Sequence, residues 1–89
     1  MKKWRLIDYF DVWGNEEDGW EVNDQTELFD DLVITDDATD EDIINYLISI
    51  GYLAKETQTD AVSIDWIDDD IAEIVQVYND MPLGRLVEM

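Results

Sequence analysis

Carboxylates are the only abundant functional group in this sequence, so they decide what chemistry the chain can offer. The 89 residues include 24 Asp and Glu against five Lys and Arg, a formal net charge of −19, with no His and no Cys. Without Cys there are no disulfides, thiolate zinc sites or cysteine nucleophiles. Without His the commonest general base and transition-metal ligand are missing. The remaining uses are carboxylate catalysis, cation binding and electrostatic recognition.

Eleven of the acids fall in three short clusters. They are Glu16, Glu17 and Asp18, then Asp36, Asp37, Asp40, Glu41 and Asp42, and finally Asp68, Asp69 and Asp70. Catalysis by a carboxylate pair, as in glycoside hydrolysis, requires a deep cleft beside the pair. A chain of 89 residues leaves little room for one. We therefore predict that the protein is not an enzyme and uses no cofactor.

The second and third clusters also carry the oxygen ligands that calcium and magnesium prefer. Neither cluster has the spacing of an EF-hand loop, with its central Gly and terminal Glu. Consecutive Asp residues in a strand point to opposite faces, so Asp68–Asp70 suit a turn better than a cage of ligands. We predict no functional metal site.

Imitation of a polyanion is the third use of the carboxylates. Duplex DNA presents one charge per roughly 1.7 Å of its axis. Residues 36–42 place five acids in seven positions, near one charge per ~2 Å at the rise of a helix. The clusters together predict binding to a basic surface of another protein. The alternative is that these acids only mark a solvent-exposed helix start and solvent-exposed turns, where acidic residues are common, and bind nothing.

The net charge also limits location and partners. It repels nucleic acid and anionic membranes and attracts basic surfaces. The chain has no apolar signal-peptide core and no apolar run long enough to span a membrane, so we expect a cytoplasmic protein. Solubility or a salt-adapted host is the competing explanation of the charge.

The N-terminal part of the chain predicts a hairpin. Lys3–Trp13 is rich in β-branched and aromatic residues, and Gly19–Asn23 resumes this pattern after a turn that contains Glu16–Asp18. Trp13 and Trp20 bracket the turn, which predicts a cross-strand aromatic pair. An exposed clamp for recognition is the alternative. Residues 23–27 are predicted as a polar connection to a short apolar strand that ends at Ile34.

One helix is predicted over residues 40–50. Thr39 and Asp42 have the spacing of a capping box, and acids suit the positive end of the helix dipole. Ile43, Leu47 and Ile50 recur at helical spacing, and Gly51 ends the pattern.

The rest of the chain predicts strands. A polar loop leads to an alternating strand at Val62–Trp66, and Asp68–Asp70 form a turn. Ile71–Tyr78 also fits helical spacing, but its β-branched residues favour a strand, and Leu83–Val87 returns as the last one. The whole chain, residues 1–89, is thus predicted to be a single α+β domain, β-β-α-β-β-β, with one helix packed on a mostly antiparallel sheet.

Two segments resemble small acidic proteins encoded by bacteriophages. They are DYFDVWGNEEDGWEVN at Asp8–Asn23 and PLGRL at Pro82–Leu86, together about a quarter of the chain. This type has no assigned activity, so the resemblance implies a phage origin, a host-cell cytoplasm and nothing catalytic. In size and charge the chain is also similar, as a class, to phage inhibitors of host defence. These include DNA mimics that block restriction enzymes, uracil-DNA glycosylase or CRISPR effectors.

These observations support two hypotheses. The first is an inhibitor whose three acidic clusters stand in for phosphates on the basic surface of a host nucleic-acid-binding protein. The second is a structural or regulatory interaction module, including a homodimer, in which the acids serve solubility. Its anchors would be Trp13, Trp20 and Trp66, because Trp is enriched at interface hot spots. Mimicry requires acids gathered on one face, and the second hypothesis requires an exposed aromatic patch.

Overall fold

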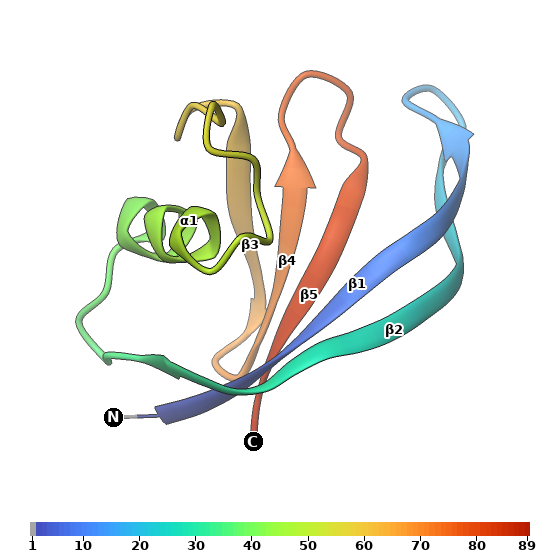
Figure 1. The fold of residues 1–89 in the computed structure, drawn as a ribbon. Coiled ribbons are helices and arrows are strands. Elements are labelled where there is room, and N and C mark those ends of the chain that lie inside the picture. The colour runs from blue at the N-terminus through green and yellow to red at the C-terminus, as the bar shows by residue number, and fades with distance from the viewer. Residues whose placement is uncertain (1) are drawn as a thin grey trace.

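The computed structural model describes residues 2–89, which form five strands and one helix (Figure 1). All four pairs of neighbouring strands are antiparallel, in the order β2-β1-β5-β4-β3. The predicted α+β arrangement with one helix is therefore confirmed. The elements are β1 (Lys2–Asn15), β2 (Gly19–Ile34), α1 (Asp40–Ser49), β3 (Val62–Asp68), β4 (Ile71–Gln76) and β5 (Pro82–Glu88).

The first two strands form one long hairpin. β2 is 16 residues long and includes residues 23–27, so the prediction of a polar connection there is wrong. Thr26 and Glu27 pair with Asp8 and Ile7 of β1, and four register shifts interrupt the ladder. β2 is an edge strand, where polar side chains can face solvent and backbone pairing needs no apolar partner.

The helix begins and ends where its local signals predict. Thr39 Oγ1 accepts a hydrogen bond from the Asp42 backbone N–H at 3.1 Å, and Asp42 Oδ2 accepts one from the Thr39 N–H at 3.0 Å. The capping box is therefore confirmed. Ile50 is the C-cap, and Gly51 follows with a φ of +88°, in the left-handed region that glycine adopts without strain.

The core lies between α1 and one face of the sheet. Antiparallel pairing places Leu6, Leu86 and Ala72 in one row across β1, β5 and β4, and all three are fully buried. The helix contributes its own apolar stripe to the same core. The cluster consists of Trp4, Leu6, Leu32, Ile34, Ile43, Ile44, Leu47, Leu53, Val62, Ile64, Ala72, Ile74 and Leu86.

The ambiguous segment after Asp70 is a strand. Along β4 fully buried Ala72 and Ile74 alternate with half-buried Ile71, Glu73 and Val75, which is the two-residue period of a sheet. The predicted strand is confirmed over Ile71–Gln76, although it stops before Tyr78. The sheet decides the conformation, since β4 pairs with both β3 and β5.

Two tyrosine hydroxyls tie elements together across the sheet. The hydroxyl of Tyr52 donates to the Leu83 carbonyl oxygen (2.8 Å) and to Asp8 Oδ1 (3.0 Å). Burial raises the pKa of Tyr52 far above its ordinary value, and the Asp8 carboxylate raises it further. Tyr9 donates to Glu73 Oε2 at 2.9 Å. Burial and this hydrogen bond raise the pKa of Tyr9 to about 12.

These shifts predict a loss of stability at alkaline pH. Unfolded tyrosines ionise near pH 10, whereas Tyr9 and Tyr52 stay protonated in the folded protein at that pH. The stability they contribute is complete below about pH 10. It decreases as the pH rises, through about pH 12 for Tyr9, by at most about 1.4 kcal/mol per pH unit for each tyrosine. Denaturant unfolding at several pH values above 9 measures this slope.

The matched variants for this prediction are Tyr52→Phe and Tyr78→Phe. Tyr52→Phe removes one ionising group and should flatten the alkaline slope. Tyr78 is three-quarters exposed, so Tyr78→Phe should leave the slope unchanged. An unaltered slope in Tyr52→Phe would contradict the assignment of the pH dependence to this hydroxyl.

Candidate acidic interface

The structure brings two of the three acidic clusters to one end of the molecule. Residues 36–42 lie in the loop before α1 and in its first turn, and Asp68–Asp70 span the turn between β3 and β4. Asp36 and Asp69 line the same hollow, which has a volume of about 120 Å³. We call the combined set the acidic end; it consists of Asp36, Asp37, Asp40, Glu41, Asp42, Asp68, Asp69 and Asp70.

Trp66 of β3 connects the two clusters. Its indole Nε1 donates a hydrogen bond to Asp40 Oδ1 at 3.0 Å, which links the strand to the first residue of the helix. The ring packs edge-on against Trp4, with 5.9 Å between ring centroids and an angle of 73° between the ring planes. Such a geometry is favourable for aromatic pairs. Asp40 of the acidic end is therefore held by a packed aromatic pair.

No ion pair among residues 2–89 includes a member of the acidic end, although Lys2 lines the hollow that Asp36 and Asp69 share. All eight side chains are exposed. The ion pairs within this range are Lys2–Glu88, Arg5–Glu27 and Arg85–Glu73. Eight negative charges are thus available to a basic partner, in a medium where salt screens them beyond about 8–10 Å.

The third predicted cluster lies elsewhere. Glu16, Glu17 and Asp18 form the tip of the β1–β2 hairpin, at the upper right of Figure 1, whereas α1 lies at the left. The turn is held by a hydrogen bond from the Asp18 backbone N–H to Asn15 Oδ1 (2.7 Å). The molecule is 38 Å long on its longest axis. The tip therefore belongs to a different surface from the acidic end.

Trp13 and Trp20 do not form the predicted cross-strand pair. Trp13 lies opposite Glu21, and Trp20 lies opposite Gly14. Since directly opposed residues share a face and successive residues alternate, the two indoles project from opposite faces. The register follows from the three-residue turn, which pairs Asn15 with Gly19. The aromatic pair that does form is Trp4 with Trp66.

The candidate aromatic anchors are dispersed. Trp13 is 64% exposed, and its Nε1 donates to Asp11 Oδ1 (2.7 Å). Trp20 is half-buried, and its Nε1 donates to the Asn79 carbonyl oxygen (2.9 Å). Trp66 is 43% exposed and lies beside the acidic end, hydrogen-bonded to Asp40. The hairpin retains exposed Phe10 and Trp13 as the aromatic surface of the second hypothesis.

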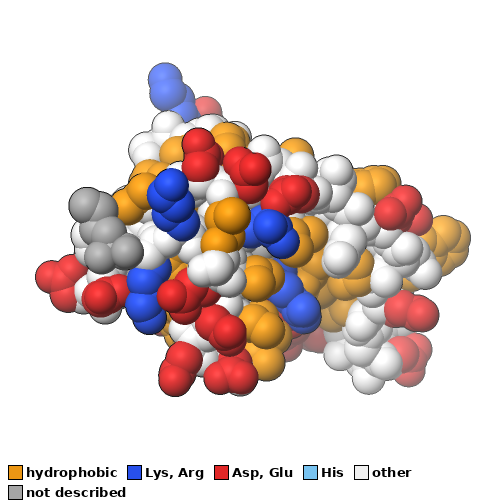
Figure 2. Space-filling view, turned by 90° about the horizontal axis from the view of Figure 1, so that it is seen from below, with side chains coloured by type: hydrophobic (Ala, Val, Ile, Leu, Met, Phe, Trp, Pro, Cys, Tyr) orange, Lys and Arg blue, Asp and Glu red, His pale blue; other side chains and the backbone are white. Residues whose placement is uncertain are grey.

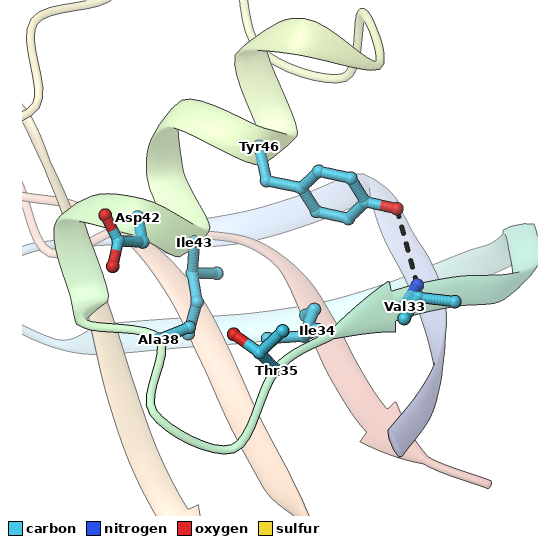
Figure 3. Close-up of a pocket in the computed structure, with 7 residues that line it drawn as sticks. All are labelled: Val33, Ile34, Thr35, Ala38, Asp42, Ile43 and Tyr46. Carbon is cyan, nitrogen blue, oxygen red and sulfur yellow. Dashed lines mark hydrogen bonds between the residues drawn. The ribbon is translucent and has the colours of Figure 1, made fainter. Parts of the chain in front are cut away.

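A second, more apolar hollow lies beside the acidic end, between α1 and the end of β2 (Figure 3). Its volume is about 170 Å³. The Val33 backbone N–H donates to the Tyr46 hydroxyl at 3.4 Å along one side. Asp42 is the one charged residue that lines this hollow. The other lining residues are Val33, Ile34, Thr35, Ala38, Ile43 and Tyr46. Sequence periodicity did not reveal this hollow, because it depends on how the helix meets the strand.

Two further questions concern metals and membranes. Among residues 2–89 no group of three or more acidic side chains is arranged so that it could hold a metal ion. Within the same described range, no helix combines the length and hydropathy of a membrane-spanning segment.

No protein-family model matches the chain, and neither a curated protein nor a solved structure matches it. The resemblance to small phage proteins therefore stays a prediction. The functional assignment rests on the geometry of the acidic end.

Proposed function

We propose that the protein binds the basic, nucleic-acid-binding surface of another protein through its acidic end and blocks access of nucleic acid to it. The observation that carries this proposal is the meeting of two clusters that are separated in the chain. Asp36 and Asp69, one from each cluster, line one hollow with Trp66, which is hydrogen-bonded to Asp40. The similarity in size and charge to phage inhibitors of host defence, as a class, favours a host nuclease, CRISPR effector or other defence factor as the target.

The frame of the acidic end makes it better suited to mimicry than a flexible acidic tail. The capping box holds Asp42 and the first helical turn, and the Trp66 indole holds Asp40. Charges held in place lose less conformational entropy on binding. They also direct encounter with a basic surface, which accelerates association by about 10–10³-fold and weakens with salt.

A charge-neutralising variant of the acidic end tests this proposal. Asp36, Asp37 and Glu41 are exposed and take no part in the side-chain hydrogen bonds of Thr39, Asp40 and Asp42. The variant D36N/D37N/E41Q therefore removes three charges and leaves the cap and Trp66 in place. The matched control is E16Q/E17Q/E21Q, which removes three charges from the hairpin.

The assay is capture of proteins from the lysate of the producing or infected cell, followed by displacement with duplex DNA or RNA. We expect nucleic acid to displace the captured protein. For the purified partner, D36N/D37N/E41Q should lower the association rate by about tenfold or more and flatten its salt dependence. The hairpin control should change the rate less. Equal effects of the two variants, or no competition by nucleic acid, would refute binding through the acidic end.

The exposed aromatic residues of the hairpin support a second candidate function, a module that binds its partner through aromatic contacts. Phe10 is 57% exposed, close in sequence to exposed Trp13 on β1. In the same assay this function predicts that Trp13→Ala abolishes capture, that D36N/D37N/E41Q does not, and that salt has little effect.

A further inference from the structure

The sheet face opposite α1 differs in character from the rest of the molecule. Strand register places Arg5, Val87 and Ile71 side by side in one row. The next row on this face contains Ile7, Arg85, Glu73 and Asp65, from β1, β5, β4 and β3. We call this surface the open face; with the neighbouring residues of the same register it consists of Lys3, Arg5, Ile7, Glu27, Ser63, Asp65, Asp68, Ile71, Glu73, Val75, Arg85 and Val87.

Charges on the open face nearly cancel. Its cations are Lys3, Arg5 and Arg85, and its acids are Glu27, Asp65, Asp68 and Glu73, so its formal charge is 3 − 4 = −1 in a chain of −19. Four of the five cations of the chain lie on β1 and β5. Viewed from below, Lys and Arg side chains gather among hydrophobic ones, with Asp and Glu beside them (Figure 2).

Aliphatic side chains fill the space between these charges. Ile7, Ile71, Val75 and Val87 are each half-buried, although α1 packs on the other side of the sheet. Arg5 pairs with Glu27, and Arg85 Nη2 lies 3.2 Å from Glu73 Oε2. Antiparallel sheets often leave one face in water, but such a face usually carries polar side chains. The four aliphatic side chains and the two arginines are residue types compatible with the centre of an interface, and the remaining charges suit its polar rim.

We propose that the open face binds the open face of a second copy of this chain, so that two sheets pack against each other in a symmetric dimer. A two-fold axis sets the same patch against itself, and a patch with three cations and four acids can then place cations opposite acids. Elsewhere two copies that each carry −19 repel one another. The molecule measures 38 × 25 × 23 Å, so its broad face can supply the roughly 800 Å² per partner of a standard interface.

This dimer is independent of the proposed function. The helix lies on the other side of the sheet, so residues 36–42 of both copies stay accessible in a dimer, and Asp68 is the one member of the acidic end that borders the open face. The two associations also respond to salt in opposite directions. Binding to a basic partner weakens as salt increases, whereas self-association strengthens because salt screens the repulsion between the two copies.

Sedimentation velocity across a range of protein concentrations, in about 20 mM and about 500 mM NaCl, tests the proposal. The variants are Val87→Glu, in the centre of the open face, and Lys3→Glu, which is exposed and should fold normally. The matched control is Val77→Glu, at a residue 47% exposed outside the strands. Circular dichroism establishes that each variant is folded.

We expect the wild type to sediment as a species of twice 10.4 kDa at high salt and to dissociate at low salt. Val87→Glu and Lys3→Glu should each weaken dimerisation at least about tenfold, and Val77→Glu should behave as the wild type. If Val87→Glu does not fold, the Lys3→Glu variant alone tests whether the open face forms the dimer. A wild type that stays monomeric at high salt and high concentration overturns the proposal, as does a Lys3→Glu variant that dimerises as the wild type does. Neither result bears on binding through the acidic end.

Discussion

Replacement of Leu47 by alanine should lower the free energy of unfolding by about 2–5 kcal/mol. Leu47 is fully buried, at 0% exposure, in the core between α1 and the sheet. Its carbonyl oxygen also accepts hydrogen bonds from the Tyr52 and Leu53 backbone N–H groups, so the turn after the helix is anchored at the same residue. Truncation removes buried methyl groups and leaves a cavity that the surrounding sheet can fill only in part.

Urea unfolding followed by circular dichroism measures this loss, which is large against the 5–15 kcal/mol of a typical domain. Asn45→Ala is the matched control, because Asn45 is exposed on the same helix. Alanine is the better helix former there, so this change should be neutral or slightly stabilising. A loss below about 1 kcal/mol for Leu47→Ala would show that the helix is not packed on the sheet as described.

Gly84→Ala should be the second strongly destabilising change, with an expected loss of about 1–3 kcal/mol. Gly84 is buried on β5, between Asp8 of β1 and Ile74 of β4. A Cβ atom at this position would lie 2.6 Å from the Ile7 carbonyl oxygen and would collide with the Tyr52 hydroxyl. The restriction is therefore one of space. Tyr52 occupies the volume of the missing side chain while it donates to the Leu83 carbonyl oxygen.

A double variant separates the two collisions. In a Tyr52→Phe background the hydroxyl is gone, so Gly84→Ala should cost less than in the wild type. The contact with the Ile7 carbonyl oxygen remains, so part of the loss should persist. Thermal or urea unfolding of the two single variants and the double variant completes the cycle. Strict additivity would mean that Tyr52 does not restrict residue 84.

Charge is distributed unevenly over this small domain. The acidic end collects eight exposed carboxylates, whereas the open face sets three cations against four acids. Net repulsion at −19 opposes compaction, and the cations on the central strands β1 and β5 reduce it where strands are close. Two surfaces that share only Asp68 follow, one suited to a basic partner and one suited to self-association.

Features with local causes could be predicted from the sequence. The capping box of Thr39 and Asp42 and the glycine at residue 51 determine the limits of α1 through contacts within a few residues. The turn at Asp68–Asp70 and the strand character of β4 follow from turn-forming and β-branched residues. The order of elements and the fold class follow in the same way.

Features that depend on pairing between distant strands were decided by the tertiary structure. Residues 23–27 are polar and lack a strand signal, but pairing with β1 makes them part of β2. The opposite directions of Trp13 and Trp20 depend on register, and a shift of one residue exchanges the faces. The meeting of Asp36 with Asp69, and the nearly balanced rows of the open face, require the sheet to bring separate segments together. Composition determines how much charge this protein carries, but only the assembled sheet determines where that charge is concentrated and where it nearly cancels.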